Sequence, residues 1–322
     1  HLLTGDTAHA LPVVPGHEGC GNVEEIGKNV TRVKKGDKIA LNWAPNCGKC
    51  FYCIHSRPSL CEAYTELIWD GYLMDGTTRM SIDGKLLYHY CALSCLSEYA
   101  VVPEASCVKM PNEIPDDVAA LIGCAVTTGV GSALNTVQIS KDDTVAVLGA
   151  GGVGLSTIMG VAYAGASQII AIDIVPEKEI IARNVGATDF LLSSQDTIKQ
   201  IKSITNNRGV DYAFEAVGIP KLQELAFEIV RPGGTLVLSG ITPMGSETNF
   251  SGAVLTRQEK TVKGSYYGTS DTSRDFRNYA NLFLAGELPI DKMISRSYDL
   301  DQVNEAYKDM LAGKGGRGII RF

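Results

Sequence analysis

Four cysteines lie close together in the sequence, with spacings that suit a metal ion. The pattern C-x2-C-x2-C-x7-C is formed by Cys47, Cys50, Cys53 and Cys61. Four thiolates this close together can surround one Zn²⁺ in a closed tetrahedron, which leaves no coordination position for a substrate. The polar neighbours Asn46, Lys49 and Arg57 argue against four unpaired cysteines in a core. The pattern therefore predicts a structural zinc lobe at about residues 46–62.

A glycine-rich loop at residues 149–154 could bind a dinucleotide. It follows the apolar run 144–148 and precedes a helix expected over 153–164. Such a turn lets backbone amides approach a pyrophosphate at a helix N-terminus. Asp173 ends the next expected strand, 168–172, and could accept hydrogen bonds from both hydroxyls of an adenosine ribose. Its carboxylate would repel a 2′-phosphate, which favours NAD over NADP, although Lys178 could weaken that preference.

Two further residues could hold a metal, but neither is specific by itself. His17 stands in Gly-His-Glu-Gly, where Glu18 could lie beside a metal. Cys124 lies where an expected β-rich part gives way to an expected α/β part. Clefts between domains often carry chemistry. On residue type alone, His17 could equally be an ordinary surface or core histidine.

The elements that would position these residues divide into two groups. Residues 1 to about 125 contain short β segments separated by turns, which predicts a mainly β domain. From residue 126, strands and helices alternate, which predicts a parallel sheet covered on both faces. The strands are expected at 19–25, 32–33, 37–41, 98–102, 144–148, 168–172, 190–192, 210–216 and 235–239. The helices are expected from near 116 and over 153–164, 176–184, 197–205, 220–230, 273–285 and 300–312. A last strand at 317–322 is expected to return to the first domain.

Size and composition narrow the class of protein. A chain of 322 residues is long enough for two domains. A net charge of −7 and a pI near 5.3 argue against nucleic acid as the main partner. No run of 18 apolar residues occurs, so no membrane span is expected. Nine cysteines, an odd number with C-x-x-C spacing, favour metal binding in a reducing compartment, and we expect the cytoplasm.

Over essentially its whole length the sequence resembles the zinc-dependent medium-chain alcohol dehydrogenases. The resemblance rests on Gly-His-Glu-x-x-Gly at 16–21, the four-cysteine lobe and the loop at 149–154, in that order. It implies an α/β fold with a doubly wound, NAD-binding Rossmann domain at 126–267. It also implies a mainly β, GroES-like catalytic domain at 1–125 and 268–322. The family would use NAD and two zinc ions per full-length subunit, one catalytic and one structural, in a homodimer or homotetramer.

The resemblance also assigns individual roles. It makes His17 and Cys124 two of three catalytic zinc ligands, with Glu18 beside the metal. The third ligand would be a cysteine in a Cys-x-Ser/Thr-Asp motif, which is absent, so we expect a missing N-terminal segment. His1 would end a proton relay, and Arg317 and Lys178 would bind the pyrophosphate and the ribose. The dinucleotide loop would use Gly149, Gly151, Gly152, Val153 and Gly154. The nicotinamide pocket would be formed by Thr128, Val153, Ser239, Ile241, Ser265 and Tyr267.

The function implied is reversible NAD-linked oxidation of a small-molecule alcohol to an aldehyde. Trp43, Tyr90 and Cys91 fall at substrate-pocket positions, and an apolar pocket without assigned charge favours medium-chain or aromatic primary alcohols. Glu66 could make its mouth more polar. One alternative is a polyol or sugar dehydrogenase. Another is a glutathione-dependent formaldehyde dehydrogenase, although that group usually has an arginine after Cys61, where residues 62–66 read Glu-Ala-Tyr-Thr-Glu. A zinc-lobe binding module without catalysis, with one zinc and no NAD, is a third reading.

Overall fold

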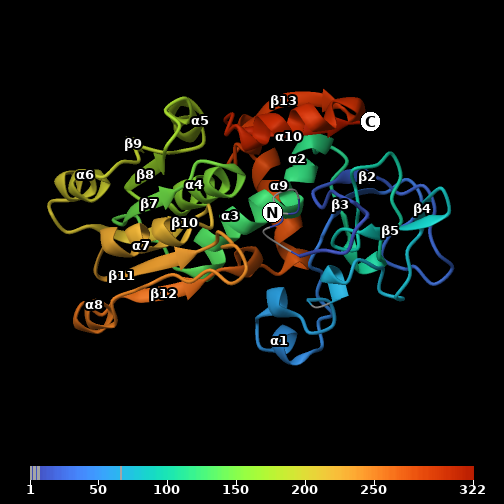
Figure 1. Ribbon diagram of the computed structural model, residues 1–322, viewed down its shortest axis with the longest axis horizontal. Helices are drawn as coiled ribbons and strands as arrows, with labels where there is room; N and C mark the ends of the chain where they lie inside the picture. Colours follow the sequence, from blue (N-terminus) through green and yellow to red (C-terminus); the bar gives the residue numbers. More distant parts are fainter. Residues whose placement is uncertain (1, 3–4, 6–7, 66) are drawn as a thin grey trace.

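The computed structural model describes residues 2, 5, 8–65 and 67–322 (Figure 1). His1 and Glu66, to which the sequence assigns a relay and a pocket mouth, lie outside the described residues. Figure 1 shows a large sheet on one side of the molecule and shorter strands on the other, with the C-terminal elements beside helix α2. The predicted fold class, an α/β Rossmann unit joined to a mainly β unit, is confirmed.

The large sheet has six parallel strands in the order β12-β11-β10-β7-β8-β9. Residues 145–148 of β7 are completely buried, which explains why that strand is a continuous apolar run. The order reverses between β7 and β10, so a ligand crevice is expected at the carboxyl ends of these strands. The strands are β7 (Thr144–Leu148), β8 (Gln168–Asp173), β9 (Asp189–Leu192), β10 (Val210–Glu215), β11 (Val230–Leu238) and β12 (Thr261–Gly264). The helices between them are α4 (Gly152–Ala164), α5 (Lys178–Asn184), α6 (Thr197–Ile204), α7 (Pro220–Ile229) and α8 (Gly252–Arg257).

Shorter strands form two three-stranded sheets in the first part of the chain, in the orders β1-β5-β4 and β2-β3-β6. The strand expected at 98–102 is wrong, because Tyr99 and Val101 are exposed and no neighbouring strand pairs with the segment. Residues 32–33 also form no strand. The strands are β1 (Val13–Val14), β2 (Cys20–Asn22), β3 (Lys38–Leu41), β4 (Met80–Ile82), β5 (Lys85–His89) and β6 (Cys107–Lys109). The short helices are α1 (Phe51–Ile54), η1 (Pro58–Leu60), η2 (Leu67–Trp69) and η3 (Glu104–Ser106).

One helical run, residues 116–136, joins the two parts of the molecule. Asp116 and Asp117 in its first turn suit the positive end of the helix dipole. By length and composition the run could cross a membrane, but 78% of its most apolar window is buried within the protein, as is typical of a core helix. The run consists of α2 (Asp116–Leu121), η4 (Ile122–Val126), α3 (Thr127–Gly131) and η5 (Ser132–Thr136), of which η4 and η5 are π-helical.

The C-terminal residues return to the first part of the chain. Arg321 forms an ion pair with Asp117, and Arg317 forms one with Glu18. Helix α9 contacts β6 and η4. These contacts support the domain division that we propose, 1–125 with 268–322 against 126–267. The elements are η6 (Tyr266–Thr269), α9 (Thr272–Leu284), η7 (Ile290–Met293), β13 (Ile294–Asp299), η8 (Leu300–Gln302), α10 (Val303–Leu311) and β14 (Arg317–Arg321).

Candidate active site and zinc lobe

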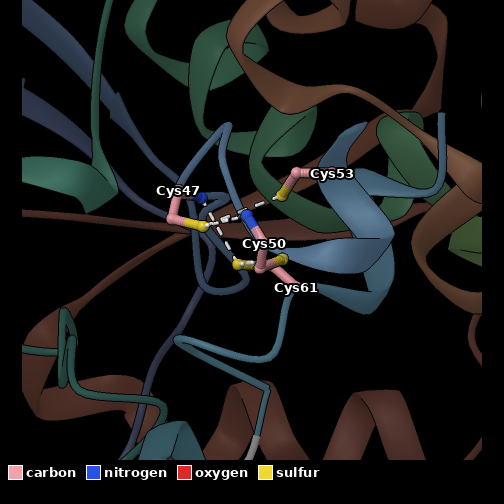
Figure 2. Close-up of side chains that lie close together, drawn as sticks. All are labelled: Cys47, Cys50, Cys53 and Cys61. Atoms are coloured by element: carbon pink, nitrogen blue, oxygen red, sulfur yellow. Dashed lines mark hydrogen bonds between the residues drawn. The ribbon is translucent and has the colours of Figure 1, made fainter. Parts of the chain in front are cut away.

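The four lobe cysteines point toward one another from the turn before α1, from α1 and from the end of η1 (Figure 2). Their sulfur atoms all lie within 4.8 Å of one another. The Sγ–Sγ distance is 4.0 Å between Cys47 and Cys53 and 3.9 Å between Cys50 and Cys61. A tetrahedral zinc ion with bonds of about 2.3 Å separates its sulfur ligands by about 3.8 Å. The lobe therefore fits a closed four-thiolate zinc site without rearrangement.

Backbone amides prepare this cluster for negative charge. The amides of Lys49 and Cys50 donate to the Cys47 sulfur at 3.5 and 3.3 Å, and the Cys47 amide donates to the Cys61 sulfur at 3.3 Å. Amide donation, chiefly from Cys53, lowers the pKa of Cys50 to about 6, whereas burial raises the pKa of Cys61 to about 12. Because a cation is needed to hold all four groups as thiolates, this donor set suits a metal ion.

His17 lies beside two aromatic side chains. Its ring centroid is 5.5 Å from that of Tyr90 and 6.3 Å from that of Trp43. Trp43 in turn contacts Tyr267, with the ring centroids 4.6 Å apart and the rings tilted by 47°. Burial, with a smaller contribution from the charge of Arg317, lowers the pKa of His17 to about 4. The imidazole is therefore neutral near pH 7 and offers a lone pair to a cation.

Cys124 lies in the same neighbourhood, in the π-helical segment η4. Burial and then the nearby Cys91 thiol raise the pKa of Cys124 to about 12, while Thr128 and Trp43 act in the opposite direction. Tyr90, which contacts His17, also has its pKa raised by burial, by Cys91 and by Cys124. Such a buried thiol ionises at neutral pH only beside a strong positive charge. Within the described residues, no third potential ligand joins His17 and Cys124, because the lobe is the only group of three or more there.

Both carboxylate oxygens of Glu18 are engaged by neighbours. Oε1 accepts a hydrogen bond of 2.8 Å from the Ala125 amide, and Oε2 forms the ion pair with Arg317. Glu18 therefore contacts Ala125, the residue after Cys124. This position suits a residue that holds the Cys124 segment in place better than one that coordinates the metal directly.

Arg317 links Glu18 to the dinucleotide loop. A Cβ atom added to Gly152 would be 2.9 Å from Arg317 Nη1, so the arginine lies directly against the loop. Its Nε atom is buried and has no hydrogen-bond partner among the described residues. An unpartnered buried donor beside a helix N-terminus fits an anionic group such as a pyrophosphate.

The loop itself requires glycine at two positions. Gly149 has a φ of 97°, in the left-handed region. A Cβ atom on Gly154 would be 1.7 Å from the Gly149 carbonyl oxygen. No side chain fits at that distance, so the turn between β7 and α4 depends on Gly154.

Asp173 is buried at the end of β8 and is already surrounded by donors. Its carboxylate accepts hydrogen bonds from the amides of Ala150 and Val175, at 2.7 and 3.0 Å. Lys178 Nζ lies 3.2 and 3.0 Å from its two oxygens. The ammonium group partly compensates the negative charge, so Asp173 repels a 2′-phosphate less than an isolated carboxylate would.

The residues that the sequence assigns to the nicotinamide pocket do not all line the same cavity. Ser239, Ile241 and Ser265 line one cavity of about 350 Å³. Tyr267 does not line it, because its side chain is buried and its hydroxyl donates to the Gly123 carbonyl. Tyr266 lines the cavity instead.

A chain of hydroxyl groups lies behind this cavity. Ser132 Oγ donates to the Thr128 carbonyl at 2.6 Å and lies 2.9 Å from the Oγ atoms of both Ser239 and Ser265. The ends of β11 and β12 are thus tied to the helical run at α3 and η5. Ser132 was not among the residues that the sequence singled out, since a serine in an apolar helix shows no recognisable pattern.

Two further residues near the site had no distinctive sequence signal. The rings of His9 and Tyr90 have centroids 5.4 Å apart and are tilted by 43°, and His9 Nε2 is buried with no hydrogen-bond partner in the described part of the chain. A lone histidine in a loop belongs to no motif, so nothing in the sequence could have selected it. Arg57, which the sequence showed only as a polar lobe residue, lines the same cavity as Ser239 and Ser265.

The six-stranded parallel sheet, the four-thiol lobe and the neighbouring His17 and Cys124 are features expected of a zinc-binding dehydrogenase. Residues 1–112 match the family model for the alcohol dehydrogenase GroES-like domain, and residues 152–285 match that for zinc-binding dehydrogenases. The chain belongs to the zinc-dependent medium-chain alcohol dehydrogenase family. It is therefore an oxidoreductase, and both its domains and its cysteine cluster support zinc binding.

Similar proteins cover nearly the whole chain. An NDMA-dependent alcohol dehydrogenase from Amycolatopsis methanolica is 36% identical over 323 residues, 99% of this chain and 87% of that protein. An S-(hydroxymethyl)glutathione dehydrogenase from Escherichia coli is 37% identical over 330 residues, 99% of this chain and 88% of that protein. The crystal structure of benzyl alcohol dehydrogenase from Acinetobacter calcoaceticus matches with a TM-score of 0.92 and 29% identity, covering 100% of this chain and 87% of that one.

Proposed function

We propose that this chain oxidises primary alcohols of medium length or with aromatic groups to aldehydes, reversibly, with NAD as the hydride acceptor. The observation that carries the proposal is that His17 and Cys124 both lie beside the aromatic side chains of Trp43 and Tyr90. Apolar walls stabilise apolar substrates by about 25 cal/mol per Å² of buried surface.

A zinc ion held by His17, Cys124 and a further ligand would supply Lewis-acid chemistry, which lowers the pKa of a bound hydroxyl group. The neutral His17 imidazole keeps its lone pair for that ion, and Glu18 holds the helical segment next to Cys124 through the Ala125 amide. Thr128 and Val153 would orient the nicotinamide, with Ser239 and Ser265 fixed behind it by Ser132. The aromatic walls would exclude water from the reacting carbon.

The alternative enzymes differ in substrate and in hydride acceptor. One relative is named for S-(hydroxymethyl)glutathione, but this chain has no arginine at residues 62–66 to meet a glutathione carboxylate. Another is named as NDMA-dependent, so NAD as the acceptor remains part of our proposal. A polyol dehydrogenase would need polar groups that these aromatic walls do not offer.

A substrate panel tests the proposed reaction. We expect kcat/KM with NAD to rise from ethanol to hexanol and benzyl alcohol, and to be lowest for sorbitol, because the pocket rewards apolar area. Initial rates with NAD, NADP and NDMA as acceptors would be measured on the same preparation. A fall in kcat/KM from ethanol to hexanol, or turnover of sorbitol alone, would contradict the proposed substrate class.

The choice of cofactor depends on Asp173. Replacing Asp173 with alanine is expected to raise the KM for NAD about tenfold and to relax discrimination against NADP, because the ribose contact and the repulsion are both lost. Lys178→Ala is the matched variant, since it removes the compensating charge and should sharpen that discrimination. Steady-state kinetics with NAD and with NADP measure both the KM and the discrimination between the two cofactors. A wild-type enzyme that prefers NADP would show that Asp173 does not select NAD.

We also propose a cytoplasmic homodimer or homotetramer that acts on small molecules, without nucleic acid or membrane partners. All nine cysteines are free thiols, which is consistent with a reducing compartment. Size-exclusion chromatography with light scattering would determine the number of subunits.

A further inference from the structure

The carboxyl group of Glu215 is buried at the end of β10, behind the wall of the cavity in which the proposed nicotinamide residues lie. Glu215 is completely buried. Its backbone carbonyl accepts hydrogen bonds of 2.9 Å from the amides of Ser239 and Gly240. A Cβ atom built on Gly240 would be 2.6 Å from Glu215 Oε2, and Gly240 lines the cavity of about 350 Å³. The carboxyl group therefore lies against a residue of the cavity wall that has no side chain.

We propose that the negative charge of Glu215 strengthens the binding of NAD⁺ relative to that of NADH. This inference rests on the proposed function, because it requires NAD as the cofactor and its nicotinamide in this cavity. The nicotinamide ring carries a positive charge in NAD⁺ and none in NADH, whereas the pyrophosphate and the adenosine are the same in both forms. A fixed negative charge behind the ring therefore attracts the oxidised ring and leaves the reduced ring almost unaffected.

The hydrogen bonds to this carboxyl group favour its ionised form. Oε1 accepts from the amides of Val217 and Gly218, both at 2.8 Å, and Gln223 Nε2 donates to Oε2 at 3.3 Å. Among the described residues, no hydrogen bond has the carboxyl group as the donor, as the neutral acid would need. Burial raises the pKa of Glu215, while the amides of Gly218 and Val217 and the side chain of Gln223 act in the opposite direction.

No cation compensates the charge of Glu215 in the part of the chain that the structure describes. All three of its donors are neutral, whereas Asp211, at the other end of β10, forms an ion pair of 2.6 Å with Arg231. Arg57 lines the same cavity, but it is exposed, so solvent screens its charge. A buried carboxylate without a cation costs folding free energy, and its place beside a ligand cavity favours a functional role.

Glu215 also holds a turn that contacts both sides of the dinucleotide site. A Cβ atom on Gly149 would be 2.4 Å from Val217 Cγ2, and one on Gly218 would be 2.2 Å from the Ile241 carbonyl oxygen. Loss of the hydrogen bonds from Val217 and Gly218 would therefore disturb the binding of every form of the cofactor. The overall affinity reports this structural role, whereas the ratio of the affinities for NAD⁺ and NADH reports the charge.

The test measures the dissociation constants of NAD⁺, NADH and ADP-ribose by calorimetry, on full-length enzyme with its zinc bound. Glu215→Gln keeps the shape of the side chain and removes its charge, so the ratio of Kd for NAD⁺ to Kd for NADH should rise about tenfold. That rise corresponds to an increase of about 30 mV in the midpoint potential of the bound cofactor. ADP-ribose, which lacks the nicotinamide, should bind the wild type and Glu215→Gln with similar affinity.

Three further variants separate charge from structure. Asp211→Asn is the matched control, because Asp211 also accepts a backbone amide, that of Thr144 at 2.8 Å, but lies at the end of β10 away from the cavity, so the ratio should not change. Glu215→Asp keeps the charge on a shorter side chain, so it should weaken both forms and keep most of the wild-type ratio. Should Glu215→Gln not fold, Gln223→Lys places an ammonium group beside the retained carboxylate and should raise the ratio in the same way. An unchanged ratio in the folded variants that remove or compensate the charge overturns the inference, as does an equal rise in Glu215→Asp.

Binding and turnover together separate this inference from the proposed reaction. The expected change of ratio in an enzyme that oxidises no alcohol would reject the proposed reaction and support the role of Glu215. Oxidation of benzyl alcohol with NAD, together with a ratio that does not depend on the charge of Glu215, would do the reverse. A wild-type enzyme that binds neither NAD⁺ nor NADH would reject both.

Discussion

Replacing His17 with alanine is expected to lower kcat/KM for benzyl alcohol about a thousandfold or more while the protein stays folded. The change removes the imidazole whose lone pair is kept free by a pKa of about 4, so one of the two described ligands of the proposed catalytic zinc is lost. Lewis-acid stabilisation is worth several kcal/mol of transition-state energy, and each 1.4 kcal/mol corresponds to about a factor of ten.

The measurement is steady-state kinetics together with zinc content per chain and thermal unfolding. Wild-type protein of full length should hold two zinc ions, and His17→Ala should lose one of them with little change in the unfolding midpoint. His55→Ala, at an exposed histidine next to helix α1, is the matched control and should retain both activity and zinc. Full activity in His17→Ala, or a single zinc in wild type, would reject the assignment.

Replacing Cys47 with serine is expected to destabilise the protein by several kcal/mol. The Sγ atom of Cys47 lies 4.0 Å from that of Cys53 and accepts hydrogen bonds from two backbone amides. Replacing Cys47 therefore removes one of the four proposed zinc ligands and weakens both hydrogen bonds. A closed structural zinc site contributes directly to folding free energy.

Urea unfolding and zinc analysis measure this effect. Cys47→Ser should lose one zinc, and the rest of the lobe should become sensitive to proteolysis near residues 46–62. Cys107→Ser, at a half-buried cysteine in β6 outside the cluster, should retain the zinc and most of the stability. An unchanged unfolding midpoint in Cys47→Ser would mean that the cluster does not hold a structural metal.

Most elements of the cofactor unit could be predicted from the sequence, but α8 and β12 had no expected counterpart, and β11 begins at Val230 rather than at residue 235. The apolar run 144–148, the glycine loop and the acid at 173 are local signals, and β7, α4 and β8 match the expected bounds within about one residue. The mainly β unit could not be predicted as well. Its strands are two to six residues long, so their existence depends on distant partners, such as β5 for β1, rather than on local pattern. The exposed segment 98–102 has strand-like composition without such a partner.

The candidate site shows the same contrast between residues with a local sequence signal and residues brought together only by the fold. The lobe cysteines span 15 residues and were identified by spacing alone. The ion pair between Glu18 and Arg317 joins residues 299 positions apart, and nothing local indicates that these two side chains meet. Arg57 is similar, because its place in the cavity depends on how the lobe packs against the loops after β11 and β12.

The return of β14 to the first part of the chain sets the order in which the two units can be completed during synthesis. Strands β7 to β12 lie within residues 144–264 with no strand of another sheet between them. All six strands can therefore leave the ribosome while the residues after 264 are still being synthesised. The unit that carries His17 can form its ion pairs with Arg317 and Arg321 only after those two residues have been synthesised. Its buried cysteines and aromatic side chains are therefore expected to stay exposed longer in the nascent protein than the core of the cofactor sheet.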